Sequence, residues 1–150
     1  MKPSEIPLGY YTHIFYSFAL IHPQTFHITD MDAETGKHYR EVTGLKSKQP
    51  DLEVWIAIGG WAMNDPGDYR TTFSDLAKSD AAQDAFFESL ITFMGIHNFD
   101  GVDIDWEVNC PVLCPLFVLD LDLISCAIIH STPSPKIVEA FPRISTTFRA

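Results

Sequence analysis

The sequence predicts an α/β fold built on a parallel sheet. Three stretches are rich in apolar, β-branched and aromatic residues, as buried strands are: residues 11–21, 52–61 and 99–107. Segments of helical character separate them, and strands that alternate with helices form βαβ units. At 150 residues the chain has the size of one domain with a single core.

The first expected strand is YTHIFYSFALI, residues 11–21, which stops two residues before a proline. A polar stretch follows at residues 30–51, in which Val42 and Leu45 are spaced apolar residues. This pattern predicts a loop that enters a surface helix ending before Pro50.

The second expected strand is LEVWIAIGGW, residues 52–61, which is closed by paired glycines. The next residues, AMNDPGDYR, have the composition of a loop and are predicted as one.

A helix is expected to begin at Ser79, whose hydroxyl can cap it, with Asp80 suited to the positive end of the helix dipole. Its end is predicted between Gly95 and Asn98. Helical spacing forms an apolar stripe from Phe86, Phe87, Leu90, Ile91 and Met94.

The third strand, FDGVDIDWE, sets four carboxylates into nine residues. Side chains alternate along a strand, so Asp103, Asp105 and Glu107 are expected on one face. The other face carries the apolar residues Val102, Ile104 and Trp106. Asp100 is out of phase with the three acids and is expected at the entrance of the strand.

Crowded carboxylates cannot all ionise easily away from bulk water, so at least one is expected to hold a proton at neutral pH. A retained proton is what a general acid needs. Glu107 is the candidate, because it lies at the carboxyl end of its strand, where parallel α/β sheets place their active sites. Two other interpretations remain: a solvated edge strand, or oxygen ligands for a hard cation completed by other loops.

The net charge is −10, and residues 1–107 carry all of it, because residues 108–150 hold three acidic and three basic side chains. Such an acidic surface disfavours nucleic acid and anionic membrane as partners. The most apolar stretch, residues 112–129, contains a proline and two aspartates, which disfavours a membrane span. The cysteines are expected to have no chemical role; they are Cys110, Cys114 and Cys126.

The motif from Asp100 to Glu107 resembles the DGxDxDxE signature of family 18 glycoside hydrolases, the chitinases. Upstream, residues 11–18 resemble the second barrel strand of that family, and residues 58–61, IGGW, resemble the glycine pair closing the third. Residues 3–107 are most similar to the fungal, killer-toxin-like branch. The resemblance implies a (β/α)8 TIM barrel, of which this chain supplies about the second to fourth βα units.

The resemblance also implies an activity, the hydrolysis of β-1,4-linked N-acetylglucosamine in chitin, with retention through substrate assistance. Glu107 would be the acid and base, Asp105 would orient the acetamide of the substrate, and Asp103 would share a proton with Asp105. The remaining implied roles are substrate binding by Trp61, Phe18 and Gly60, and structural support by Asp100 and Gly101. No cofactor and no metal are implied, and the partner would be chitin or chito-oligosaccharides.

Two departures from the family pattern are visible. Ala57 stands where the family commonly has serine, so a hydrogen bond toward Asp103 is lost. After Glu107 nothing resembles the later barrel strands, so residues 1–107 are interpreted as a partial catalytic barrel and residues 108–150 as an unmatched, irregular tail. A complete barrel needs about 250 residues. The isolated chain is therefore expected to be poorly soluble and weakly active or inactive.

Two further hypotheses come from the same residues. The chain can be a chitin-binding lectin on the same barrel, although such lectins typically lose the glutamate that Glu107 retains here. It can also be a fragment without function. An extracellular location is expected from the family, although residues 1–11 lack the apolar run of a secretory signal.

Overall fold

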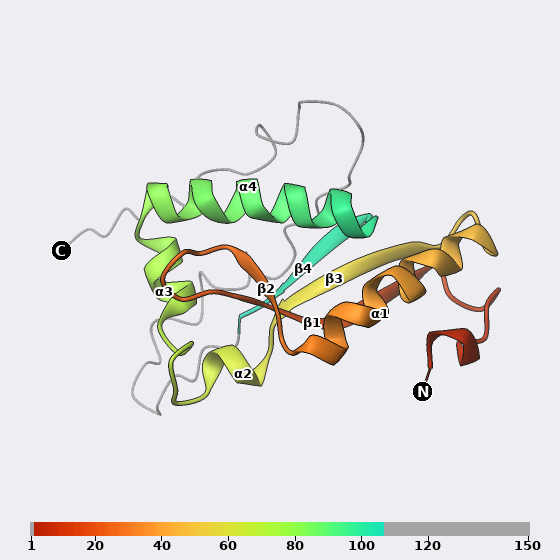
Figure 1. The fold of residues 1–150 in the computed structure, drawn as a ribbon, viewed down its shortest axis with the longest axis horizontal. Coiled ribbons are helices and arrows are strands. Elements are labelled where there is room, and N and C mark those ends of the chain that lie inside the picture. Colours follow the sequence, from red (N-terminus) through yellow and green to blue (C-terminus); the bar gives the residue numbers. More distant parts are fainter. Residues whose placement is uncertain (1, 107–150) are drawn as a thin grey trace, which may run out of the picture.

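A computed structural model of the chain describes residues 2–106, and these form a four-stranded sheet covered by helices (Figure 1). The strands are β1 (His13–Ile21), β2 (Ile28–Asp30), β3 (Glu53–Gly59) and β4 (Gly101–Asp105), in the spatial order β2-β1-β3-β4. β1, β3 and β4 are parallel, as predicted, whereas β2 returns antiparallel to β1. β2 was not predicted, because three residues are too few to show an alternating pattern.

Helical segments connect β2 to β3 and β3 to β4, and two of these segments were not predicted. A helical turn, α2, begins at Trp61, which was expected to end the second strand, and it occupies the start of the segment expected to be a loop, so the loop prediction is wrong for residues 62–64. α3 follows shortly afterwards. The complete set is η1 (Pro3–Glu5), α1 (Ala33–Thr43), η2 (Gly44–Ser47), α2 (Trp61–Asn64), α3 (Thr72–Ala77) and α4 (Asp80–His97).

Helix α1 begins at an aspartate cap, because the Asp32 carboxylate accepts hydrogen bonds from the backbone N–H groups of Glu34 and Thr35. The helical turns end before Pro50, as predicted, and the two spaced apolar residues, Val42 and Leu45, are both buried. The prediction missed Tyr39, which is fully buried.

Helix α4 has the ends that its sequence predicts. The Ser79 hydroxyl accepts a hydrogen bond from the Ala82 N–H at 3.2 Å, and Asn98 ends the helix in the left-handed conformation. Phe86, Leu90 and Met94 are buried. Ile91 is 44% exposed, so the prediction that it belongs to the apolar stripe of the helix is wrong. It follows Leu90 directly and therefore points about 100° away around the helix axis.

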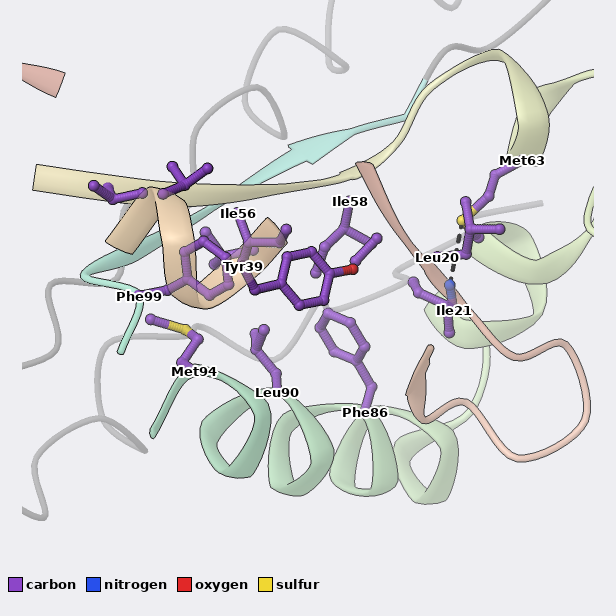
Figure 2. Close-up of a cluster of buried hydrophobic side chains, with 14 of the residues drawn as sticks. Leu20, Ile21, Tyr39, Ile56, Ile58, Met63, Phe86, Leu90, Met94 and Phe99 are labelled. Carbon is purple, nitrogen blue, oxygen red and sulfur yellow. Dashed lines mark hydrogen bonds between the residues drawn. The ribbon is translucent and has the colours of Figure 1, made fainter. Parts of the chain in front are cut away.

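The hydrophobic core lies between one face of the sheet and the helices α1 and α4 (Figure 2). Tyr39 from α1 sits at its centre, between Ile56 and Ile58 of β3 and the apolar residues of α4. Its ring meets those of Tyr16, Phe93, His97 and Phe99 edge-on, at centroid distances of 5.0–5.6 Å. This packing fixes the back of the sheet, and the acidic residues of β4 face the other way.

Candidate active site

The strand that carries the acids has the two faces predicted for it. Val102 is 1% exposed, and Ile104 and Trp106 pack against the same core. Asp103 and Asp105 alternate with these residues and therefore lie on the opposite, front face of the sheet. Both are half-buried. Same-face neighbours on a strand are roughly 6–7 Å apart, close enough for the two carboxylates to interact electrostatically.

Strand β3 provides the floor beside the acids. In the parallel register, Ala57 lies next to Asp103, and Gly59 lies next to Asp105. The methyl group of Ala57 offers no hydrogen bond to Asp103. Gly59 has a φ of +126°, and a Cβ placed on it would come within 2.1 Å of the Asp105 carbonyl oxygen. The backbones of β3 and β4 therefore lie so close together at Gly59 and Asp105 that there is no space for a side chain at position 59.

The pKa of Asp103 is raised above its ordinary value of 3.8. Burial is the larger cause, because it disfavours the charged form, and the negative charge of Asp105 adds to it. The predicted electrostatic coupling between neighbouring acids is therefore present for this pair. Glu107, the expected acid catalyst, lies outside the described residues, as do the three cysteines and the whole of residues 108–150.

The remaining acid of the motif, Asp100, is bound into the entrance of the strand. Its carboxylate accepts hydrogen bonds from the Val54 N–H and from Lys46 Nζ, at 2.8 and 2.7 Å. Gly101 follows it, and the ring of Trp55 leaves no room there for a side chain, because a Cβ would lie 2.6 Å from the indole. These two residues thus hold β4 against β3.

Replacing Asp100 with alanine is expected to lower the free energy of unfolding by about 1–3 kcal/mol, because the buried Val54 N–H loses its partner. Asp100→Asn keeps an acceptor oxygen for this N–H and is expected to cost less. Urea denaturation of both variants measures the difference. Equal losses in the two variants would mean that the hydrogen bond to Val54 is unimportant.

The residues expected to bind sugar form a corner beside the acids. Gly60, at φ +70°, donates its N–H to the Asp105 carbonyl oxygen at 3.0 Å. The ring of half-buried Phe18 abuts Gly60, since a Cβ on Gly60 would lie 3.0 Å from it. Trp61 comes next in the chain and is 69% exposed. Gly60 therefore joins the acidic strand, Phe18 and Trp61.

Three residues of this region were missed by the sequence reasoning. Lys46 is the charged partner of Asp100, with its ammonium group 2.7 Å from the carboxylate. Asn64 and Met63 are buried below the Gly60 corner. No pattern in the sequence marks them: Lys46 is far away along the chain, and the other two lie in a segment with the composition of a loop.

Two observations about metal ligands and helix length apply to the described residues. Within residues 2–106, no three histidine, cysteine, aspartate or glutamate side chains converge in a way that would hold a metal ion. In the same range, no helix has the length and apolarity that crossing a membrane requires.

The family follows from comparison with known proteins. The model of the family described as "Glycosyl hydrolases family 18" matches residues 1–121. The chain belongs to glycosyl hydrolases family 18. Among relatives, an endochitinase of Brugia malayi is 36% identical over 110 residues, which are 70% of this chain and 21% of that protein. The chain thus spans about a fifth of that relative's length.

Solved structures of family 18 proteins show the same fold. Catalytic domain 2 of an Ostrinia furnacalis Group II chitinase, an E2180L mutant in complex with an N-acetylglucosamine oligosaccharide, matches with a TM-score of 0.63 and 30% identity. The match covers 71% of this chain and 27% of that one. A chitinase-like agglutinin of Robinia pseudoacacia matches with a TM-score of 0.64 at 26% identity, over 74% of this chain and 32% of that one. The described residues are therefore part of a (β/α)8 barrel, about its second to fourth βα units.

Proposed function

We propose that the acidic motif from Asp100 to Glu107 forms part of a chitinase active site. This site hydrolyses β-1,4-N-acetylglucosamine linkages with retention of configuration at the anomeric carbon. One observation carries the proposal. Asp103 and Asp105 share the front face of β4, next to the Gly60 corner, and the pKa of Asp103 is raised by burial and by Asp105. A carboxyl group with a raised pKa beside a second carboxylate can supply the shared proton that the proposed substrate-assisted mechanism needs behind the acetamide, while Glu107 acts as acid and base.

In the first step of the proposed mechanism, Glu107 gives its proton to the glycosidic oxygen as the bond to the anomeric carbon breaks. The acetamide oxygen of the substrate forms a bond to that carbon from the opposite side, which produces a cyclic oxazolinium ion. In the second step, the Glu107 carboxylate takes a proton from water while the water oxygen attacks the anomeric carbon. The acetamide is thereby regenerated, and the two inversions give net retention.

Asp105 and Asp103 have different proposed roles toward the acetamide group of the substrate. Asp105 is the nearer to Glu107 in the strand, so it orients the acetamide and stabilises the positive charge that develops on its nitrogen. Asp103 lies on the side of Asp105 that is away from Glu107 along the strand, and it shares a proton with Asp105. Its raised pKa supports this role, because a carboxyl group that holds a proton can donate it to a neighbouring carboxylate.

We assign substrate binding to the corner next to these acids. Trp61 offers an exposed ring on which the apolar face of a sugar can stack. Phe18 and Gly60 line the floor, and the absence of a side chain on Gly60 leaves space between the Phe18 ring and the sugar. Chitin or chito-oligosaccharides are the ligands that this combination of acids and aromatic rings suits.

A second candidate function is chitin binding without cleavage, on the same barrel. The match to a chitinase-like agglutinin favours it, because that structure shares the sheet described here. The presence of Glu107 favours the enzyme. Oligosaccharide binding that is unaffected by Glu107→Gln, without any turnover, would identify the lectin.

We further propose that the chain belongs to the fungal, killer-toxin-like branch and that the complete protein acts outside the cell. The similarity of residues 3–107 to that branch supports both statements. Residues 1–107 are proposed as a partial catalytic barrel and residues 108–150 as a tail, the first part of which, up to residue 121, is still matched by the family model.

The test of the proposed function is a chimera in which residues 1–107 replace the matching segment of the Ostrinia furnacalis catalytic domain. The 150-residue chain alone is expected to turn over tetra-N-acetylchitotetraose weakly or not at all, because the later barrel strands are needed to surround the sugar. The chimera is expected to hydrolyse it, with β-anomers as the first products in proton NMR. An α-anomer as the first product would refute the retaining mechanism, and a folded but inactive chimera would refute the chitinase assignment.

A further inference from the structure

The turn that carries Trp61 is held by a buried side-chain amide. Asn64 is 8% exposed, and its Nδ2 donates a hydrogen bond to the Gly60 carbonyl oxygen at 2.7 Å. The same oxygen accepts a bond from the Met63 N–H at 3.1 Å. The carbonyl of Gly60 is therefore fixed by two donors, one of them a side chain.

A second anchor lies one residue earlier in the turn. Met63 is fully buried, and its sulfur accepts the Ile21 N–H at 3.4 Å (Figure 2). This contact joins α2 to the carboxyl end of β1, the strand that also carries Phe18. The side chains of Met63 and Asn64 point into the protein, whereas Trp61 on the same turn is 69% exposed.

These anchors matter because α2 has only four residues. An isolated helical turn of this length is unstable in water, since its formation fixes several dihedral angles in return for one hydrogen bond. The orientation of α2, and with it that of the Trp61 ring, therefore depends on the buried contacts below it. Gly60 also donates its N–H to the Asp105 carbonyl, so the same residue links the turn to the acidic strand.

We infer that Asn64 is a positioning residue for saccharide binding. Its amide fixes the Gly60 carbonyl and thereby sets both the direction of the Trp61 ring and the distance of this ring from Asp105. The inference depends on the proposed function, since it presumes that Trp61 stacks on a sugar. Asn64 itself does not touch the substrate; it acts through Gly60 and Trp61.

The test compares Asn64→Asp with Gln83→Glu in the 150-residue chain. Both variants replace a buried amide that donates to backbone carbonyls: Asn64 to Gly60, and Gln83 to Leu76 and Ala77 at the end of α3. The chain is labelled with 5-fluorotryptophan, which gives three fluorine signals, for Trp55, Trp61 and Trp106. The variant Trp61→Phe assigns the signal of interest.

Without ligand, Asn64→Asp is expected to shift or broaden the Trp61 signal, because a carboxylate facing the Gly60 oxygen cannot donate and repels it. Gln83→Glu is expected to leave that signal unchanged. In the chimeric barrel that carries residues 1–107, the dissociation constant for tetra-N-acetylchitotetraose is expected to rise roughly fivefold to tenfold in Asn64→Asp only. The milder pair Asn64→Ala and Gln83→Ala gives the same comparison if a carboxylate prevents folding.

Equal effects of the two substitutions on the Trp61 signal would overturn the inference, since Asn64 would then act only on overall stability. A different outcome concerns the proposed function. If the unaltered chimeric barrel that carries residues 1–107 does not bind the oligosaccharide at any concentration tested, the proposed function fails, while the ligand-free Trp61 signal of the 150-residue chain still decides whether Asn64 positions the ring.

Discussion

Replacing Glu107 with glutamine is expected to lower kcat by about 10²–10⁴-fold in the chimeric barrel that carries residues 1–107. Glutamine keeps the size and much of the polarity of glutamate but has no proton to give to the glycosidic oxygen. The dissociation constant for tetra-N-acetylchitotetraose is expected to stay within about twofold, because binding relies on aromatic stacking and neutral hydrogen bonds. Steady-state kinetics and isothermal titration calorimetry measure the two quantities.

The matched control for this substitution is Glu88→Gln. Glu88 lies on α4, the helix that packs against the back of the sheet, away from the acidic face of β4. Its kcat is expected to equal that of the unaltered chimera. A Glu107→Gln variant with full activity would show that another group supplies the proton, and the assignment of Glu107 would be wrong.

Replacing Gly59 with alanine is expected to lower the free energy of unfolding by roughly 2–6 kcal/mol, the sum of backbone strain and overpacking. The φ of +126° is unfavourable for any residue with a Cβ, and this Cβ would meet the Asp105 carbonyl at 2.1 Å. The Cβ would be bonded directly to the backbone of β3 and the carbonyl belongs to the backbone of β4; both backbones are fixed in the sheet, so neither atom can move away. Chemical denaturation with urea measures the loss.

Gly44→Ala is the control for this second prediction. Gly44 has a φ of −63°, and no atom lies within 4 Å of a Cβ placed on it. Its substitution is expected to change stability by less than about 1 kcal/mol, in either direction. Similar losses at Gly44 and Gly59 would mean that the close approach of β3 and β4 does not limit what position 59 can hold.

The elements that the sequence predicted correctly have local causes. The ends of α4 follow from Ser79 and Asn98, which act on neighbouring backbone groups. The two faces of β4 follow from simple alternation, since Val102 and Asp103 must point in opposite directions. The parallel pairing of β1, β3 and β4 follows from the helical segments between them.

The elements that were missed depend on contacts between distant residues. α2 is a single turn whose stability comes from Met63 under Ile21 and from Asn64 under Gly60, and no local pattern reports such contacts. Tyr39 lies in a polar stretch, and its burial depends on aromatic residues from α4 and from the middle of β1.

The same distinction between local causes and contacts of distant residues applies to the candidate site. Alternation predicts that Asp103, Asp105 and Glu107 face the same side, and the crowding of charge predicts that at least one of the three holds a proton at neutral pH, with Glu107 as the candidate. The structure adds what the sequence lacks, the burial of Asp103, which raises the pKa of its carboxyl group, whereas Glu107 lies outside the described residues. The role of Gly60 as the joint between the acidic strand and Trp61 depends on the register of β3 against β4, which a single sequence does not contain.

The raised pKa of Asp103 has a consequence for stability. The folded state binds the Asp103 proton more tightly than the unfolded state, in which the pKa is near 3.8. The contribution of this residue to stability is therefore greatest below pH 3.8 and is lost as the pH rises through the folded-state pKa. Asp105→Asn removes the like charge, so it is expected to lower the pKa of Asp103 and to raise the melting temperature more at pH 7 than at pH 3.

The coupling of the two acids is tested most directly by carbon-13 NMR titration of the Asp103 carboxyl group in the 150-residue chain and in its Asp105→Asn variant. The expected result is a pKa above 3.8 in the unaltered chain that falls in the variant. A pKa at the ordinary value in both proteins would contradict the proposal that Asp103 and Asp105 share a proton and, with it, the mechanism assigned to this face of the sheet.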